Sequence, residues 1–288
     1  MKPTILLYGN CQAQDIATIA SAIPCLQGRV TFKSIAWYVG AGPDWDAAHG
    51  PDFMRDIGAV WEQVESGPIA EHRTALHRHL PAGCQIVRFP PLTMTALWPF
   101  VGSDPRQISS NRYFWTDSVA AALANSNLPD DELFATYMRL STERMPDLER
   151  RLRLDLVRWR ATDALSDIRL ADYVLEHFRT TRLFYTMAHV SAVPLRHVLR
   201  SLIDLTDVIN PSLAWEAKLE VDVILRHHRG QDFEMVPLHP IVAERLNLAY
   251  YDPDERHRYY GHAWTHKEYI LNYIRWASYL GRARLSVL

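Results

Sequence analysis

The chain has few cysteines and no long apolar segment. Its three cysteines, Cys11, Cys25 and Cys84, are an odd number, with neither a CxxC motif nor a metal-type spacing. This pattern argues against a disulfide framework and favours a reducing, cytoplasmic location. No apolar stretch approaches the roughly 18 residues that a membrane span needs, and the run before Gly9 is too short for a secretory signal. We therefore expect no membrane span.

The charge is nearly balanced, and biased segments are missing. The 288 residues include 31 Lys and Arg against 33 Asp and Glu, which gives a net charge of −2. No overall field therefore favours nucleic acid or a membrane surface as a partner. The content of 48% hydrophobic and 22% charged residues is that of a globular protein. Neither an internal repeat nor a linker rich in proline and glycine divides the chain.

The N-terminal third alternates between strand and helix patterns. Short apolar or β-branched runs predict strands at 4–8, 30–38 and 84–89. Helical spacing predicts helices at 15–23, 54–65 and 69–79. Further helices are predicted at 118–125, 130–139, 147–160, 164–179, from His189 to about 203, and at 264–279, with one more strand at 184–187. The order predicts an α/β fold, with a small parallel sheet and extensive, mainly helical elaboration.

We predict one α/β domain over residues 1–288, since no linker separates its halves. Its sheet-rich core spans approximately 1–110, and 111–180 forms a helical insertion or cap. Residues 181–288 return to the core and end in helices.

The stretch "LLYGNCQAQ", residues 6–14, places a cysteine where a strand meets a helix. Gly9 lets another chain or a ligand approach closely. The free N–H groups and partial positive charge at a helix N-terminus favour the thiolate of Cys11. Asn10 and Gln12 add amide donors that could face an oxyanion. The junction suits acyl transfer or phosphate binding; the alternative is that Cys11 is a small buried hydrophobe and Asn10 a helix cap.

Two of the thirteen histidines lie where an element ends. His189 follows "RLFYTMA" and precedes a helix, and His239 lies between Pro237 and Pro240 before another helix. Rigid positions of this kind suit a general base that meets a cysteine from elsewhere in the chain. The alternative for each is helix capping or loop packing. The other histidines fit surface or structural positions, and no compact His/Asp/Glu set predicts a metal.

Arg88, in "IVRFPP", is expected at the C-terminal end of the third predicted strand. Parallel sheets bind ligands at that edge, so its guanidinium could hold a phosphate or a carboxylate. A plain ion pair is the alternative.

Five segments together resemble the WcbI-like polysaccharide-biosynthesis acetyltransferases. They are "ILLYGNCQAQ", "IVRFPPLTMTALWPF", "RLFYTMAHVSAVPLRHVL", "VPLHPIVAERLNL" and "HKEYILNYIRW", in the family's order and across nearly the whole chain. The family's GNCQ motif falls on Gly9, Asn10, Cys11 and Gln12. Its two His-Pro pairs fall on His189, where Val190 replaces the proline, and on His239-Pro240.

This resemblance implies an enzyme that uses acetyl-coenzyme A to O-acetylate a sugar of a capsular or surface polysaccharide. Cys11 would attack or orient the thioester, and His239, or else His189, would deprotonate the sugar hydroxyl. Asn10 and Gln12 would stabilise the oxyanion, and Arg88 would meet a coenzyme phosphate. The junction also resembles the Gly-Asp-Ser block of SGNH hydrolases, but Val236 stands where those enzymes have an Asp three residues before the catalytic histidine.

Two other functions stay open at this point. One is an SGNH-like esterase or deacetylase on similar glycans, and the other is a non-catalytic glycan-binding protein with an inert Cys11. Binding of coenzyme A separates the transferase from the esterase. The reactivity of the Cys11 thiol separates both enzymes from the binding protein.

Overall fold

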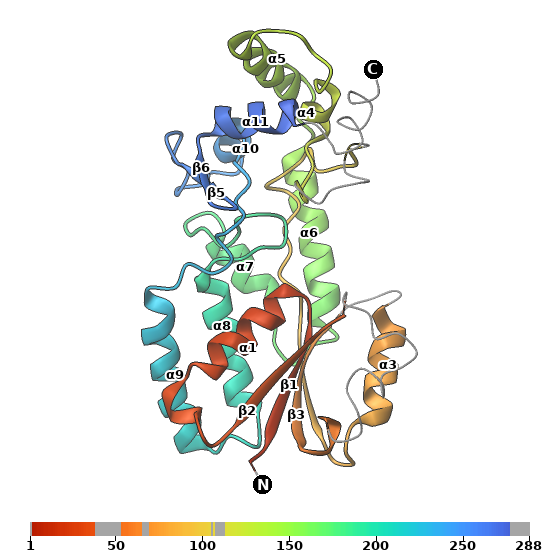
Figure 1. The fold of residues 1–288 in the computed structure, drawn as a ribbon, viewed down its shortest axis with the longest axis vertical. Helices are drawn as coiled ribbons and strands as arrows, with labels where there is room; N and C mark the ends of the chain where they lie inside the picture. The colour runs from red at the N-terminus through yellow and green to blue at the C-terminus, as the bar shows by residue number, and fades with distance from the viewer. Residues whose placement is uncertain (1, 38–52, 65–68, 105, 107–112, 277–288) are drawn as a thin grey trace, which may run out of the picture. The chain divides into compact units, whose positions relative to one another are not determined.

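The computed structural model describes residues 2–37, 53–64, 69–104, 106 and 113–276. The chain divides into two compact units, each built from separate stretches (Figure 1). Unit 1 comprises Met1–Leu92, Leu156–Glu176 and Val190–Gln231, and unit 2 comprises Thr93–Asp155, His177–His189 and Asp232–Leu288. These limits differ from the boundaries expected near residues 110 and 180, and the single domain stays a prediction.

A four-stranded parallel sheet forms the centre of unit 1, in the order β2-β1-β3-β4. The strands are β1 (Thr4–Gly9), β2 (Thr31–Ala36), β3 (Ile57–Gln63) and β4 (Gln85–Phe89). Because all four are parallel, their C-terminal ends share one edge, which is the edge where α/β sheets bind ligands. The predicted α/β fold is confirmed.

The predicted helix at 54–65 is wrong, because Ile57–Gln63 forms β3. This strand pairs with β1 on one side and β4 on the other, and every residue except Gly58 is buried. A strand buried on both faces shows no polar alternation, and its Ala, Glu and Gln residues favour a helix locally. Pairing with distant strands therefore decides its structure.

Helices cover both faces of this sheet (Figure 1). On one face lie α1 (Cys11–Ser21), α8 (Ala192–Leu205) and α9 (Pro211–Arg226), and on the other lies α3 (Ile69–His79). Leu76 of α3 packs in one buried cluster with Tyr8 and Val60. Since successive side chains of a strand point to opposite faces, Glu62 points toward α3 and Gln63 toward α1.

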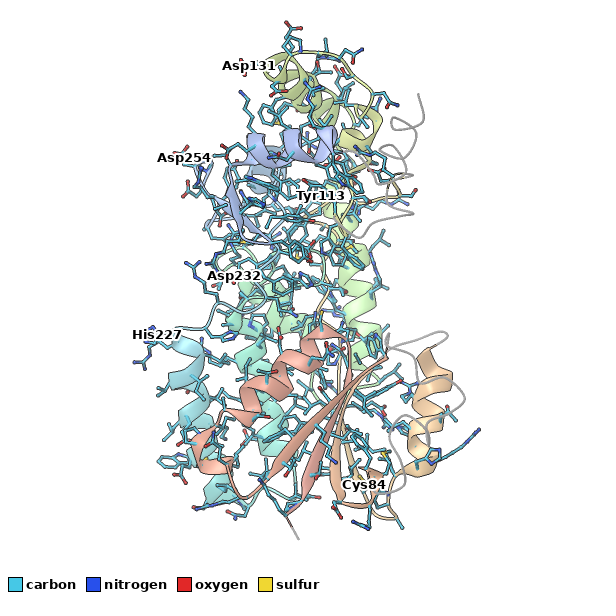
Figure 2. The ribbon with its side chains drawn as sticks, in the orientation of Figure 1. Cys84, Tyr113, Asp131, His227, Asp232 and Asp254 are labelled. Carbon is cyan, nitrogen blue, oxygen red and sulfur yellow. The ribbon has the colours of Figure 1, made fainter. Side chains whose placement is uncertain are left out.

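Unit 2 is built around an aromatic core. Its elements include α4 (Ser118–Ala122), α5 (Asp130–Glu143), α10 (Pro240–Arg245), the hairpin of β5 (His257–Tyr259) and β6 (His262–Trp264), and α11 (His266–Arg275). Tyr113, labelled in Figure 2, is fully buried. Its ring stacks on Tyr259 at 5.0 Å and meets Tyr273 edge-on at 4.9 Å between centroids.

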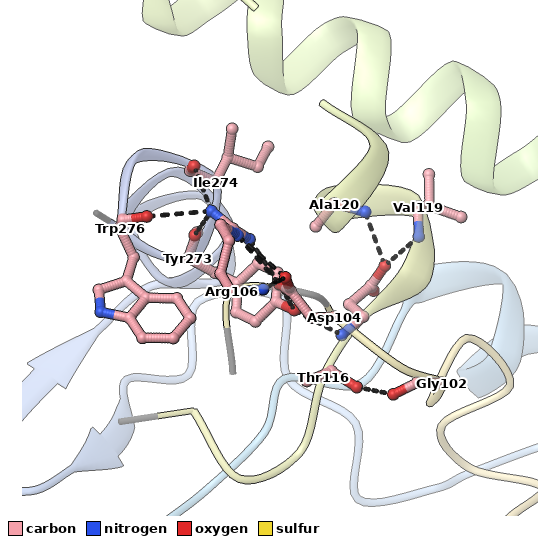
Figure 3. A network of polar contacts seen from close by, with 10 residues as sticks. Gly102, Asp104, Arg106, Thr116, Val119, Ala120, Tyr273, Ile274 and Trp276 are labelled. Atoms are coloured by element: carbon pink, nitrogen blue, oxygen red, sulfur yellow. Dashed lines mark hydrogen bonds and ion pairs between the residues drawn. The ribbon is translucent and has the colours of Figure 1, made fainter. Parts of the chain in front are cut away.

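Arg106 closes the C-terminal end of α11 (Figure 3). Its Nη1 donates to the carbonyl oxygens of Tyr273, Ile274 and Trp276 at 3.3, 2.9 and 3.1 Å. Its Nη2 donates to Oδ2 of the buried Asp104 at 2.7 Å. The last carbonyls of a helix have no partner within the helix, so this arginine supplies the donors that they lack.

Most other predicted helices are found with shifted ends, and residues 277–279 of the helix predicted at 264–279 lie outside the described residues. The region 147–179 contains α6 (Leu148–Asp163) and the shorter α7 (Ala171–His177), both of which carry residues of both units. The predicted strand at 184–187 is wrong, because Phe184 forms only an isolated bridge and 185–187 are bends that lead to His189. Neither α9 nor the β5–β6 hairpin was predicted. Among the described residues, no helix has the length and apolar character to cross a membrane.

Candidate functional site

Gly9 stands where β1 and α1 meet, and only a glycine fits there. A Cβ atom at this position would lie 2.7 Å from Ala13 Cβ and 2.8 Å from both Cβ and Oε1 of Gln63. Contacts this short require the neighbours to move. The glycine therefore serves close packing between β1, α1 and β3.

Asn10 and Gln63 hold the turn between strand and helix. The Asn10 backbone N–H donates to Gln63 Oε1 at 2.9 Å, and Asn10 Oδ1 accepts the Gln12 N–H at 2.9 Å as the N-cap of α1. The cap uses only Oδ1, so the Asn10 side-chain amide is available to donate to a ligand. The predicted capping role and the predicted oxyanion role are therefore compatible.

Gln12 is buried, and its side chain fastens the turn to the chain after β4. Its Nε2 donates to the Leu92 carbonyl at 2.6 Å, and its Oε1 accepts from the Leu92 N–H and from Gln63 Nε2, each at 3.0 Å. These contacts favour a positioning role for Gln12 over the predicted role as an oxyanion donor.

Cys11 is the first residue of α1 and is only partly exposed. Burial raises the pKa of its thiol above the ordinary value, and the nearby Asp15 acts in the same direction. A hydrogen bond from Gln231 and the backbone N–H groups of Gln12 and Cys11 lower the pKa, but by less. The expected bias toward thiolate is therefore not met, because desolvation outweighs the helix N-terminus. Near neutral pH the side chain is a thiol.

Gln231 organises the surroundings of Cys11. Its Oε1 accepts the Val190 N–H at 3.1 Å, and its own backbone N–H donates to the Val190 carbonyl at 2.9 Å. The Gln231 side chain also lowers the pKa of both Cys11 and Asp15. The side chain is 1% exposed. It therefore ties the start of α1 to Val190, the residue that follows His189 in the chain.

His189 lies at a tight turn in unit 2, enclosed by Trp115 and Phe233. Its backbone N–H donates to Thr186 Oγ1 at 2.9 Å, which fixes the turn. The ring centroid lies 4.9 Å from that of Phe233 and 5.9 Å from that of Trp115. Burial lowers the pKa of His189 to about 4, so the imidazole is neutral near pH 7. A neutral imidazole is the form that can accept a proton.

Glu234 is the carboxylate beside His189. Its Oε2 lies 3.3 Å from His189 Nδ1, and the residue is 1% exposed. Burial raises the pKa of Glu234 to about 7, although hydrogen bonding from Trp115 and Tyr259 lowers it. The carboxyl group therefore changes protonation state near neutral pH.

His239 also lies in unit 2, but both of its ring nitrogens are engaged. Nδ1 accepts the Ile241 N–H at 3.2 Å and so caps α10, and Nε2 lies 2.9 Å from Ser141 Oγ. Because Nδ1 is an acceptor, the proton of the neutral ring is on Nε2 and is donated to Ser141. Burial lowers the pKa of His239 to about 4. The contacts favour the capping alternative over the predicted base.

Arg88 lies at the C-terminal end of β4 and pairs with a buried carboxylate. Its Nε lies 3.3 Å from Glu62 Oε1, and its backbone N–H donates to Asp167 Oδ2 at 2.7 Å. His77 contacts the other oxygen of Glu62. The ion-pair alternative is therefore found, while the Arg88 side chain stays 43% exposed.

Among the described residues, Cys25, Glu216 and Glu220 have ligand atoms within 4.8 Å of one another. Burial, together with the two carboxylates, raises the pKa of the Cys25 thiol to about 12. Exposed acidic groups of this kind are common without an ion, so this cluster gives no support for a metal. The expected absence of a metal stays a prediction.

Three of the residues that build these sites were not predicted: Gln63, Gln231 and Glu234. Gln63 was hidden by the mistaken helix at 54–65. Gln231 and Glu234 follow "RHHRG" in an irregular segment, and their partners are distant in sequence. No local pattern identifies them, since their roles arise from contacts across the fold.

The profile of the family described as polysaccharide biosynthesis enzyme WcbI matches residues 4–210. A solved structure is similar over 96% of this chain and 90% of its own, with a TM-score of 0.69 and 15% sequence identity. It is described as native WcbI, a polysaccharide biosynthesis enzyme, without a disulfide bond between coenzyme A and a cysteine of that protein. Curated protein sequences gave no significant match. The structural likeness shows a shared fold, and the profile match shows that the chain belongs to the WcbI family of polysaccharide biosynthesis enzymes.

Proposed function

We propose that this protein is a cytoplasmic O-acetyltransferase that moves an acetyl group from acetyl-coenzyme A to a sugar hydroxyl of a capsular or surface polysaccharide. The observation that carries the proposal is Cys11, a partly exposed thiol at the N-terminus of α1 on the ligand-binding edge of the sheet. The structurally similar WcbI protein is described with reference to a disulfide between coenzyme A and a cysteine. This supports coenzyme A as the carrier of the acetyl group.

Because the pKa of Cys11 is raised, its side chain is a protonated thiol rather than a nucleophilic thiolate. In the proposal this thiol orients the thioester. The Asn10 side-chain amide donates to the developing oxyanion. Arg88, with its partly exposed guanidinium, meets a phosphate of the coenzyme. The acyl group then passes directly from donor to sugar, without an acetyl-Cys11 intermediate.

His189 is the base in this proposal, because neither nitrogen of His239 is free. Its Nε2 accepts the proton of the sugar hydroxyl while that oxygen attacks the thioester carbonyl carbon. The new C–O bond forms and the C–S bond breaks. His189 then returns the proton to the departing sulfur of coenzyme A, so the enzyme ends the cycle unchanged.

Incubation with acetyl-coenzyme A and a panel of sugar acceptors tests the reaction, with release of free coenzyme A as the signal. We expect acceptor-dependent release by the wild type and by Cys84→Ser, a strong loss in His189→Gln, and a smaller loss in Cys11→Ser. Intact-protein mass spectrometry without an acceptor should show no added acetyl group. A stable acetyl-Cys11 adduct that is consumed on addition of sugar would overturn direct transfer in favour of a covalent route.

A further inference from the structure

The mechanism above gives no role to the buried carboxylate beside its proposed base. Glu234 is 1% exposed and lies in the same unit as His189, with Oε2 at 3.3 Å from the imidazole Nδ1. Burial of a carboxylate is costly unless hydrogen bonds or charges compensate it. The Trp115 and Tyr259 side chains lie close enough to lower its pKa, and among the described residues no arginine or lysine contributes to that pKa.

We propose that Glu234 is a positioning residue that selects the tautomer of His189 and so decides whether Nε2 can act as a base. This inference rests on the proposed role of His189. An ionised Glu234 accepts a hydrogen bond from Nδ1–H and leaves the lone pair of Nε2 free. A protonated Glu234 donates to Nδ1 instead, which places the ring proton on Nε2 and removes the base. The same logic orients the histidine of a Ser-His-Asp triad.

The surroundings of the His189 ring also support the positioning role of Glu234. Trp115 and Phe233 enclose the imidazole ring, and the Thr186 hydroxyl fixes its backbone. The backbone of Glu234 also raises the pKa of the ring, so both the main chain and the side chain of Glu234 lie beside it. His189 Nδ1 is buried and makes no hydrogen bond in the described structure, and Glu234 Oε2 lies 3.3 Å from it; catalytic hydrogen bonds often form fully only when substrate binds. SGNH hydrolases have an Asp three residues before the catalytic histidine, and Val236 stands at that position before His239. The carboxylate in this protein instead lies beside His189 and belongs to Glu234.

The groups around the pair determine its dependence on pH. Burial raises the pKa of Glu234 to about 7 and lowers that of His189 to about 4. Tyr260 and Tyr269 also face Glu234, and its charge helps to raise the pKa of each phenol, so both stay neutral. The carboxyl is therefore the group that titrates near neutrality, and the pair titrates as a unit. Above the transition Nε2 is a base; below it, Nε2 carries the proton.

Nitrogen NMR of the full-length protein with labelled histidine tests the tautomer directly and needs no acceptor sugar. His189→Gln identifies the signals of His189 by their loss. We expect the Nδ1–H tautomer at pH 8 and the Nε2–H tautomer at pH 6, with a midpoint near 7. In Glu234→Gln the exchange with pH should vanish, while in Glu244→Gln, an exposed control in α10, it should persist. One tautomer for wild-type His189 at both pH values would overturn the proposal, whether or not Glu234→Gln folds.

Kinetics separates this proposal from the proposed function. Glu234→Gln should lower kcat by about 10²- to 10⁴-fold, as loss of a triad carboxylate does, with little change in coenzyme A affinity. Glu234→Asp should restore part of the rate and keep the step in the pH profile. An unchanged kcat and pH profile in Glu234→Gln would contradict the role of Glu234 alone. Absence of acetyl transfer by the wild type would contradict the proposed function, and the tautomer measurement would still decide the role of Glu234.

Discussion

Replacing Gln231 by leucine removes the polar side chain that lies between Cys11 and Val190 in unit 1. The change keeps the size of the side chain but removes its hydrogen bonds. The Val190 N–H loses its acceptor at 3.1 Å, and Asp15 and Cys11 each lose a neighbour that lowers their pKa. Because Gln231 is 1% exposed, water cannot readily replace these partners.

The cost follows from the individual contacts. A buried N–H without a partner costs about 1–3 kcal/mol, and the added apolar contacts of leucine offset little of this. We expect the free energy of unfolding to fall by about 2 kcal/mol. For a chain of 288 residues, the entropy of unfolding is about 0.6 kcal/mol/K, so Tm should fall by about 3 °C.

The same substitution should change the chemistry of Cys11. The hydrogen bond from Gln231 lowers the pKa of this thiol, so its loss should raise the pKa further. The midpoint of the pH–rate profile for alkylation should therefore move upward, as followed with iodoacetamide on a variant that keeps only Cys11. Gln27→Leu, at an exposed position of the same unit, is the matched control. If Gln231→Leu matches that control in both Tm and alkylation midpoint, the described network around Cys11 is wrong.

Three further predictions concern stability. Arg106→Ala should lower the free energy of unfolding by about 3–5 kcal/mol in urea titrations, because the buried Asp104 loses its charge partner and α11 loses the donors at its C-terminus. The control is Arg139→Ala, which removes an exposed ion pair with Glu143 and should cost under about 1 kcal/mol. Gly9→Ala should cost about 1–3 kcal/mol in the same assay, since its Cβ would overlap Ala13 and Gln63, and an unchanged midpoint would refute that contact. Acid should destabilise the protein, because burial lowers the pKa values of four histidines, His189, His239, His257 and His266. Below pH 6.5 the unfolded chain binds protons that the folded state refuses, so each histidine can reduce stability by up to about 1.4 kcal/mol per pH unit down to about pH 4. The raised pKa of Glu234 acts in the opposite direction below about pH 7 and offsets one of the four. A Tm that stays constant from pH 7 to 5 would contradict this prediction.

The sequence was sufficient to predict those elements whose structure depends mainly on neighbouring residues in the chain. The short apolar run, the glycine and the cap at Asn10 predicted the junction of β1 and α1, and the structure has that junction. Ile57–Gln63 could not be recognised in this way, because its strand pairs on both sides with segments distant in the chain. The helix preference of its residues therefore led to a predicted helix, because strand pairing cannot be seen in the local sequence.

The candidate site was predictable in part for the same reason. Cys11 and His189 stand at element ends that the pattern of the chain reveals. The acidic partner of His189 lies 45 residues later, in a segment without periodicity, so only the folded chain brings Glu234 to it. The pKa of Cys11 was expected to fall, since a helix N-terminus can be read from sequence, whereas the burial that outweighs it cannot.

Calorimetric titration of the purified protein with acetyl-coenzyme A tests the central claim most directly. The account predicts saturable binding of one acetyl-coenzyme A per chain, retained in Cys11→Ser and weakened in Arg88→Gln, with free coenzyme A competing for the same site. Absence of binding at millimolar acetyl-coenzyme A would contradict the assignment of this chain as an acetyl-coenzyme A-dependent transferase.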